Sequence, residues 1–251
     1  MFTILIFKIG MKSYIRLGLL FTVFIVIAAK RRTMTWLCLE FCDNSTVIDK
    51  YMEDLSEHAS LMTAVSFERY QLGPDATLVT ANVSNVIQSL HDMGIQETWA
   101  MLSSFPHPPE FMDWMREAFA NVDYFTEQCV TEALKYNYTG YNLDWEPTDG
   151  VEEGDSEAYA KFIDSFAVGL HKHNIKLQVD VAGWSDIWDY GAINNTHVDY
   201  IISMSTYTSN DDSYTNEINN MMNNIDINRI GIGIEMVNAS TGGRMPISEV
   251  K

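Results

Sequence analysis

Apolar positions recur along this chain with two different periods, and the two periods alternate. Short apolar runs, which are typical of buried strands, are followed by longer stretches with apolar residues three and four apart, which are typical of helices. The pattern predicts strands at residues 35–41, 61–67, 96–103, 141–145, 177–182, 198–204 and 229–236. It predicts helices at residues 47–57, 82–93, 108–120, 124–137, 156–174 and 216–224, with another helix starting at 247–251.

This order of elements predicts an α/β fold, a (β/α)₈ TIM-type barrel truncated before strand eight. Strands separated by helices form right-handed βαβ units and a parallel sheet, and seven of them favour a barrel over an open sheet. A complete barrel takes about 250 residues. Residues 33–251 show no eighth strand. We therefore expect residues 33–251 to form one barrel domain that is incomplete at its C-terminal end.

Residues 1–32 have the composition of a targeting segment. A 13-residue apolar run at 17–29 follows Lys12 and Arg16 and precedes three basic residues at 30–32. The run is short for a membrane span and fits the apolar region of a signal peptide. The basic residues after it favour a signal anchor instead, since positive charge tends to stay cytoplasmic. Either segment predicts a secreted or secretory-lumen protein whose only membrane contact is this N-terminal segment.

Two further features bear on the compartment. Asn-x-Ser/Thr sequons occur at Asn44, Asn82, Asn137, Asn194 and Asn238. The cysteines are Cys38, Cys42 and Cys129, an odd number, so at least one has no partner within the chain. Cys38 and Cys42 would lie roughly 13 Å apart on an extended strand, beyond the ~7 Å that a disulfide spans. They pair only if the chain bends near Glu40 or Phe41, and two buried free thiols are the alternative.

The net charge and the motifs of the chain limit the classes of ligand and cofactor that we expect it to bind. The net charge is -18, yet residues 1–32 hold six basic residues and no acid, so the rest of the chain is strongly acidic. Such a surface repels nucleic acid and anionic membranes and suits a neutral or cationic ligand, although a solvated acidic face is the simpler explanation. The chain has no His-Glu-x-x-His, Gly-x-Ser-x-Gly or Gly-Lys-Ser/Thr motif. We therefore expect no metal and no cofactor, and the oligomeric state stays open.

Two acids at alternate positions end the predicted strand at residues 141–145. Asn142, Asp144 and Glu146 share one face of an extended chain, and the residues between them share an apolar face. Converging acids push their pKa values apart and leave one protonated near neutral pH. An isolated Asp-x-Glu is more often a solvated strand end, so the neighbouring residues decide between the two interpretations.

The neighbours favour an active site. The stretch from Thr139 to Glu146 reads Thr-Gly-Tyr-Asn-Leu-Asp-Trp-Glu and resembles the fourth-strand signature of glycoside hydrolase family 18, Asp-Gly-x-Asp-x-Asp-x-Glu. The final Asp144 and Glu146 match, whereas Thr139 and Asn142 stand where the family has Asp. The family holds chitinases, chitobiases and some endo-β-N-acetylglucosaminidases. Its barrels place an aromatic residue on strand eight, before which this chain ends.

Other strands extend the resemblance to roughly residues 35–236. Residues 198–207 are similar to the family's sixth strand, where Met204 aligns and Tyr207 falls one place after the family's site tyrosine. A one-residue slip turns a side chain to the other face, which a bulge near Ser205 would correct. Trp184 or Trp188, after strand five, is a candidate to line a sugar groove. The resemblance implies that Asn142, Met204, Tyr207 and Trp184 contact substrate.

The resemblance also implies a mechanism. In this family the N-acetyl oxygen of the substrate attacks the anomeric carbon, an exception among retaining glycosidases. Glu146 then fits the general acid, and Asp144 fits the group that holds the acetamido N–H. The first hypothesis is hydrolysis of β-linked N-acetylglucosamine in chitin-type oligomers or N-glycan cores. The alternatives are a catalytically weak or inactive chitinase-like carbohydrate-binding protein, which the change at Asn142 suggests, and a barrel with no sugar site.

Overall fold

The computed structural model describes residues 32–37, 39, 45–81, 84–205 and 211–233. The predicted targeting segment, except for Arg32, therefore lies outside the described residues, as do Cys38, Cys42 and Tyr207. The end of the predicted strand at 229–236 and the helix start at 247–251 lie outside them too.

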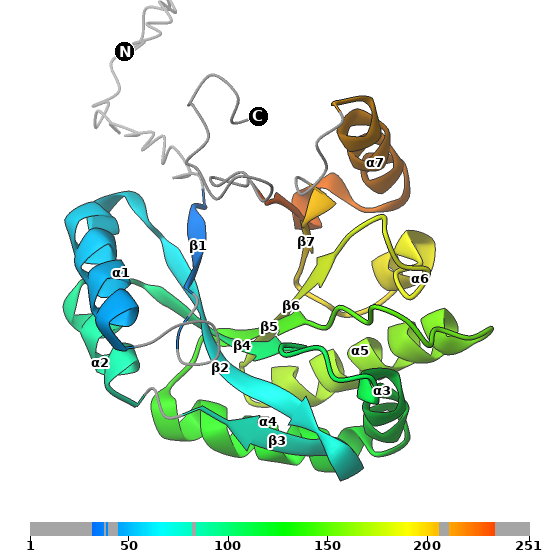
Figure 1. Cartoon of the computed structure of the whole chain (residues 1–251), viewed down its shortest axis with the longest axis horizontal. Coiled ribbons are helices and arrows are strands. Elements are labelled where there is room, and N and C mark those ends of the chain that lie inside the picture. The colour runs from blue at the N-terminus through cyan, green and yellow to red at the C-terminus, as the bar shows by residue number, and fades with distance from the viewer. Residues whose placement is uncertain (1–31, 38, 40–44, 82–83, 206–210, 234–251) are drawn as a thin grey trace, which may run out of the picture. The chain divides into compact units, whose positions relative to one another are not determined.

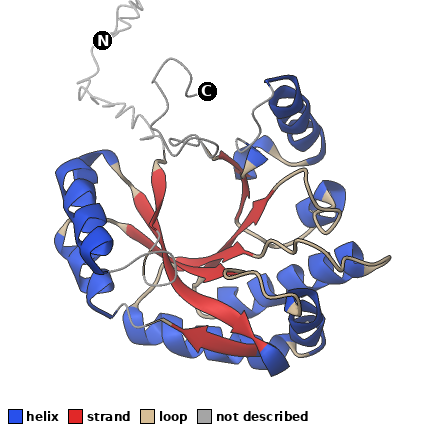
Figure 2. Ribbon diagram, in the orientation of Figure 1, coloured by secondary structure: helices blue, strands red, loops and turns tan. Residues whose placement is uncertain are grey.

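A curved sheet forms the centre of the described unit. Its parallel strands follow the path β1 (Met34–Leu37), β2 (Ala64–Gly73), β4 (Glu97–Ser103), β5 (Gly140–Asp144), β6 (Lys176–Val181), β7 (Tyr200–Ser203) and β8 (Ile230–Ile232). Figures 1 and 2 show these strands as an arc with the helices on its outer side. The fold is an incomplete TIM-like α/β barrel, which confirms the predicted fold class.

Six of the seven α-helices among the described residues occupy intervals that the apolar spacing predicts, and the short helix at Tyr190–Asn194 is the exception. The seven are α1 (Ser45–His58), α2 (Ser84–Asp92), α3 (Phe111–Ala120), α4 (Val122–Tyr136), α5 (Asp155–His171), α6 (Tyr190–Asn194) and α7 (Asp211–Asn224). Short 3₁₀ turns lie at Ala59–Leu61, Pro74–Ala76 and Ile227–Arg229. The predicted apolar stripe of α5 is buried, from Tyr159 to Leu170, because it faces the sheet.

The structure changes the bounds of one predicted strand substantially and adds two elements that the sequence did not predict. The second strand begins at Ala64 and runs on to Gly73, because the chain then turns back into an antiparallel strand, β3 (Thr77–Thr80). Residues Asp75 and Ala76 make this turn with positive φ angles of 55°. The short helix α6 was also not predicted, and the side chain of Asp189 caps it by accepting from the N–H of Ala192 at 2.9 Å.

Aromatic packing fixes the outer face of β5. Trp145, which follows the strand, has no exposed surface and stacks on Phe162 of α5 at 5.2 Å between ring centroids. Phe125 of α4 lies 5.6 Å from the same indole. Tyr141 is likewise fully buried and donates its hydroxyl to the carbonyl of Cys129 at 2.6 Å. These contacts hold the apolar face of β5 against α4 and α5, so its polar face must point inward.

A cluster of Arg32, Glu97, Trp99 and Tyr200 lies at the amino end of the strands. The guanidinium of Arg32 lies over the rings of Trp99 and Tyr200, 4.9 Å and 4.4 Å from their centroids, and pairs with Glu97 at 3.0 Å. Gly140 begins β5 beside this cluster, and an added Cβ there would lie 2.7 Å from the Trp99 ring. The absence of a side chain at Gly140 therefore allows β5 to approach its neighbours closely.

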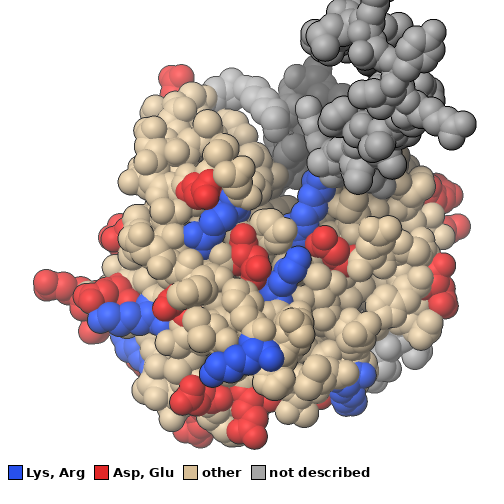
Figure 3. Space-filling view, turned by 180° about the vertical axis from the view of Figure 1, so that it is seen from behind, with Lys and Arg blue, Asp and Glu red and all other residues tan. Residues whose placement is uncertain are grey.

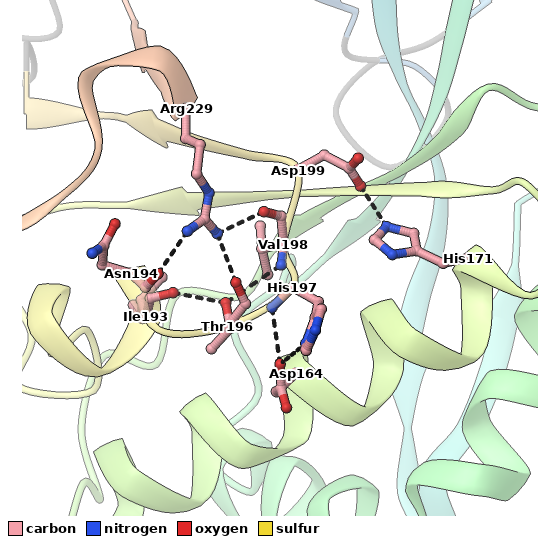
Figure 4. Close-up of polar contacts among 9 residues, drawn as sticks. All are labelled: Asp164, His171, Ile193, Asn194, Thr196, His197, Val198, Asp199 and Arg229. Carbon is pink, nitrogen blue, oxygen red and sulfur yellow. Dashed lines mark hydrogen bonds and ion pairs between the residues drawn. The ribbon is translucent and has the colours of Figure 1, made fainter.

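Hydrogen bonds brace the loops that lead into β7 and β8 (Figure 4). Arg229 donates to the backbone carbonyls of Asn194, Thr196 and Val198 at 2.6–3.1 Å. His197 contacts Asp164 of α5 at 2.7 Å, and the N–H of His197 donates to the same carboxylate. These bonds tie α5, α6 and β8 to the start of β7.

Charged side chains lie interspersed on the face in Figure 3, with basic groups set among acidic ones. Within the described residues, no helix combines the length and the apolar character that crossing a membrane requires.

Candidate active site

The two acids of the signature lie at the carboxyl end of β5. Asp144 is the last residue of the strand and pairs in register with Ser103 of β4, while Glu146 follows two residues later. Tyr141, Leu143 and Trp145 have no exposed surface. The alternation predicted from the sequence is therefore present, and in parallel barrels this end of the sheet is where active sites are built.

Asp144 lies in a setting that disfavours its negative charge. One carboxylate oxygen, Oδ1, is buried and has no hydrogen-bond partner. Burial raises the pKa of Asp144 well above its usual range, and the nearby carboxylates of Asp180 and Glu146 raise it further. A hydrogen bond between Asp144 and Glu146 raises the first pKa and lowers the second, as expected when Asp144 donates. The two signature acids therefore influence each other's ionisation.

Glu146 lines a pocket of about 530 Å³. The other walls are His107, Pro147, Thr148, Asp149, Gly150, Val151, Trp184, Ser185 and Asp186. Burial raises the pKa of Glu146, while the charge of His107 opposes this shift. A carboxyl with a raised pKa beside an accessible pocket has the property required of a general acid near neutral pH.

Two tryptophans after β6 have different surroundings. Trp184 is 50% exposed and lines the pocket, whereas Trp188 is 5% exposed and belongs to the core. The two rings meet edge to face at 5.8 Å. Of the two tryptophans considered from the sequence, Trp184 is therefore the one positioned to meet a ligand.

Asn142 has no exposed surface, and its contacts point into the barrel. Its Oδ1 accepts from Ser66 Oγ at 2.6 Å and from Trp36 Nε1 at 3.0 Å. The same indole N–H donates to Asp180 Oδ2 at 3.2 Å. Trp36, Ser66 and Asp180 were not among the predicted site residues, although Asp180 and Gln178 alternate with apolar residues along β6.

Met204 and Thr139 are not among the residues that line the pocket. Met204 follows β7, is 6% exposed and donates its backbone N–H to the carbonyl of Val181. Thr139 precedes β5 at the opposite end of the strand from Asp144, and its Oγ1 accepts from the N–H of Thr98 at 3.1 Å. The Asp-to-Thr difference at this position therefore affects strand pairing more directly than the acids. Cys129 is buried and not in a disulfide.

Metal coordination finds no support in the part of the chain that the structure describes. Across those residues, no group of three or more His, Cys, Asp or Glu side chains is arranged to hold an ion. The chemistry that the site offers is proton transfer by buried carboxyls.

Comparison with known proteins agrees with this geometry. No protein-family model matches the chain. Over 90 residues it is 33% identical to the uncharacterised glycosylase YvbX of Bacillus subtilis, a match that covers 32% of this chain and 25% of YvbX. The chain thus spans only a quarter of the length of that curated relative.

Solved structures match over most of the described unit. A chitinase of Chromobacterium violaceum superposes with a TM-score of 0.65 at 16% identity, covering 81% of this chain and 68% of that one. The spore cortex-lytic enzyme SleL of Bacillus megaterium has a TM-score of 0.68 at 16% identity, covering 80% of this chain and 49% of SleL. A class V chitinase of Nicotiana in complex with NAG4 has a TM-score of 0.61 at 10% identity, covering 81% of this chain and 66% of the chitinase.

These identities establish a likeness of fold. The chain has the glycosidase fold of chitinases and spore cortex-lytic enzymes, and the resemblance to glycoside hydrolase family 18 expected from the sequence is confirmed at that level.

Proposed function

We propose that this protein is a glycoside hydrolase that cleaves β-linked N-acetylglucosamine, in chitin-type oligomers or N-glycan cores, with retention and with help from the substrate's acetamido group. The observation that carries the proposal is Glu146, a carboxyl whose pKa is raised by burial and which lines a pocket beside Asp144. A general acid in this position donates a proton to the glycosidic oxygen as the bond breaks.

Asp144 is assigned the second role. As a carboxylate it accepts the N–H of the acetamido group, so that the acetamido oxygen lies against the anomeric carbon. That oxygen forms a bond to the carbon as the glycosidic bond breaks, and Glu146 supplies the proton that the departing oxygen takes. Water then opens the resulting oxazolinium ring while Glu146 accepts a proton back. Trp184, half exposed at the pocket, offers an apolar face to a sugar ring.

The similar structures support this substrate class. The Nicotiana enzyme was crystallised with NAG4, and the Bacillus enzymes are described as spore cortex-lytic. Chitooligosaccharides are accordingly the first substrates to test, with spore cortex as the second. A carbohydrate-binding protein without turnover is the alternative, and the specific observation in its favour is the buried amide of Asn142 where the family signature has an acid.

The test compares wild type with Glu146→Gln on chitooligosaccharides, with Glu57→Gln as the control. Glu57 is an exposed residue of α1. Removing the general acid is expected to lower kcat by about 10²–10⁴-fold while binding persists, and the control is expected to match wild type. Asp144→Ala should lose activity nearly as severely. Equal turnover by Glu146→Gln would refute the assignment, and binding without turnover by wild type would select the alternative.

For localisation we propose the secretory pathway. Asn137, one of the sequons, is exposed at the C-terminal end of α4 and is open to a glycan. Asn194 is less available, because its side chain accepts from the N–H of Asp226 at 2.9 Å. A glycan found at Asn137 after expression in a eukaryotic secretory host would support the proposal, and an unmodified Asn137 in secreted protein would count against it.

A further inference from the structure

A third acid, Asp180, lies behind the two signature acids. It is the fifth residue of β6, and the register Asn142↔Gln178 and Leu143↔Val179 places it beside Asp144 on the neighbouring strand. Adjacent strands lie about 4.8 Å apart. Asp180 is 1% exposed, which makes it the most deeply buried acid of the cluster.

The hydrogen bonds of Asp180 leave one of its oxygens free. Oδ2 accepts from Trp36 Nε1 at 3.2 Å, which fixes the carboxyl between β1 and β6. Oδ1 is buried without a partner, as are Oδ1 of Asp144 and Nδ2 of Asn142. A buried carboxylate oxygen without a donor is costly as an anion, and a proton on that oxygen removes the cost.

The groups around Asp180 favour a neutral carboxyl. Asp144 at the end of β5 and Glu146 just after it are acidic, and Glu68 on β2 adds a further carboxylate near Asp144. Tyr159 of α5 also faces the cluster, and its hydroxyl is buried. Trp36 contributes a neutral N–H donor, and the neutral amide of Asn142 lies close to the carboxyl. Among the described residues, no ion pair includes Asp144 or Asp180.

We propose that Asp180 is a positioning residue for Asp144: it holds a proton and shares it with Asp144 across the β5–β6 strand pair, so that the two aspartates together carry a single negative charge. This inference rests on the proposed function, because it explains how Asp144 becomes an anion that accepts an acetamido N–H. When the shared proton lies on Asp180, Asp144 is the anion, and Glu146 keeps a proton of its own for the departing oxygen. When it lies on Asp144, Asp180 is the anion, so the three carboxyls hold two protons in either arrangement.

The pKa values agree with this arrangement. Burial raises the pKa of Asp180 to about 8, although the neighbouring amide of Asn142 and the hydrogen bond from Trp36 act in the opposite direction. Since Asn142 cannot hold a titratable proton, β5 has no carboxyl behind Asp144, and β6 supplies one.

Infrared titration of the whole chain tests the proton directly, because a protonated carboxyl has a carbonyl stretch that a carboxylate lacks. Wild type is expected to keep this signal up to about pH 8, and Asp180→Asn to lose one carboxyl's share of it. Asp189→Asn is the control, since Asp189 is exposed and caps α6. The exchange variant, Asn142→Asp with Asp180→Asn, should regain the signal. An unchanged signal in Asp180→Asn would overturn the proposal.

Stability gives a second readout that needs no substrate. The pKa of Asp180 is raised on folding from 3.8 to about 8, so the folded state binds the extra proton between these values. The contribution of Asp180 to the free energy of unfolding is complete below about pH 4 and is lost as the pH rises through about 8. The urea midpoint of wild type should therefore fall relative to that of Asp180→Asn over this interval. Parallel curves would contradict the proposal.

The pH dependence of turnover distinguishes this inference from the proposed function. Removing a coupled acid lowers the pKa of Asp144, so the acid limb of kcat should move to lower pH by about one unit or more. The exchange variant should move it back towards wild type. If wild type hydrolyses no N-acetylglucosamine oligomer, the proposed function fails, whereas infrared titration and urea midpoints still decide the state of Asp180.

Discussion

Arg116 of α3 clamps the loop that forms one side of the pocket. Its guanidinium donates to both carboxylate oxygens of Asp155, Nε to Oδ1 at 3.1 Å and Nη2 to Oδ2 at 2.7 Å, and also to the carbonyl of Gly150 at 2.7 Å. Asp155 in turn accepts from the N–H of Glu152 at 2.8 Å. The carboxyl is 10% exposed and the guanidinium 31%. The pair therefore joins α3, the pocket loop and the start of α5.

Arg116→Met keeps the aliphatic stem and removes these bonds. A hydrogen bond to a charged group contributes about 1.5–3 kcal/mol, and exposed pairs contribute less. For this partly exposed bidentate pair we expect a loss of about 2 kcal/mol, or about 4–8 °C in Tm. Arg116 lowers the pKa of Asp155. The loss of stability should therefore be complete above the pKa that Asp155 has in the unfolded chain. It should shrink as the pH falls through the lower pKa that Asp155 has in the folded state.

Urea denaturation at neutral pH and at pH 3 measures this loss. Lys161→Met is the control, because Lys161 forms an exposed pair with Glu157 on α5 and should give no measurable change. A double-mutant cycle with Asp155→Asn isolates the coupling between the two side chains. A loss below about 0.5 kcal/mol, or equal losses at both pH values, would refute the assignment of the clamp to this ion pair.

Two further predictions concern the acid and the strand that carries it. His107→Gln removes a charge that lowers the pKa of Glu146, and since a general acid works only while protonated, the basic limb of the pH profile of kcat should move to higher pH. The exposed control His173→Gln should leave that limb unmoved. An unmoved limb in His107→Gln would exclude a role for His107. Gly140→Ala places a methyl group against the carbonyl of Lys176 and 2.7 Å from the Trp99 ring, so thermal denaturation should show a loss of about 3 kcal/mol in the free energy of unfolding. Gly191→Ala is the control, because the nearest atom to its added Cβ is 3.3 Å away. An equal effect of both substitutions would contradict the packing argument.

The parallel order of strands is predictable from the sequence because its signals are local. Apolar runs and helical stripes report burial directly, and the stripe from Tyr159 to Leu170 packs as its spacing predicts. The placement of Asp144 follows from alternation along β5, since its apolar partners Tyr141 and Leu143 are fully buried. The position of the candidate active site at Glu146 follows for the same reason, because the carboxyl ends of parallel strands meet at one edge.

Features that depend on register between strands were not predictable. Asp180 and Asn142 come together because β6 pairs with β5 in one register, and Trp36 reaches both from β1, more than a hundred residues earlier. The hairpin that adds β3 depends on positive φ angles at Asp75 and Ala76, and Ala76 gives no sequence signal for such an angle. His107 reaches the pocket from a loop whose path the sequence does not specify.

The most direct test of substrate assistance is the initial rate of cleavage by wild type on two matched chitotetraoses. One is fully acetylated, and the other has a free amine on the sugar that occupies the reacting position. If Asp144 holds an acetamido group whose oxygen attacks the anomeric carbon, only the acetylated tetramer is cleaved. Cleavage of both at equal rates would contradict the central claim, because another nucleophile would then perform the attack.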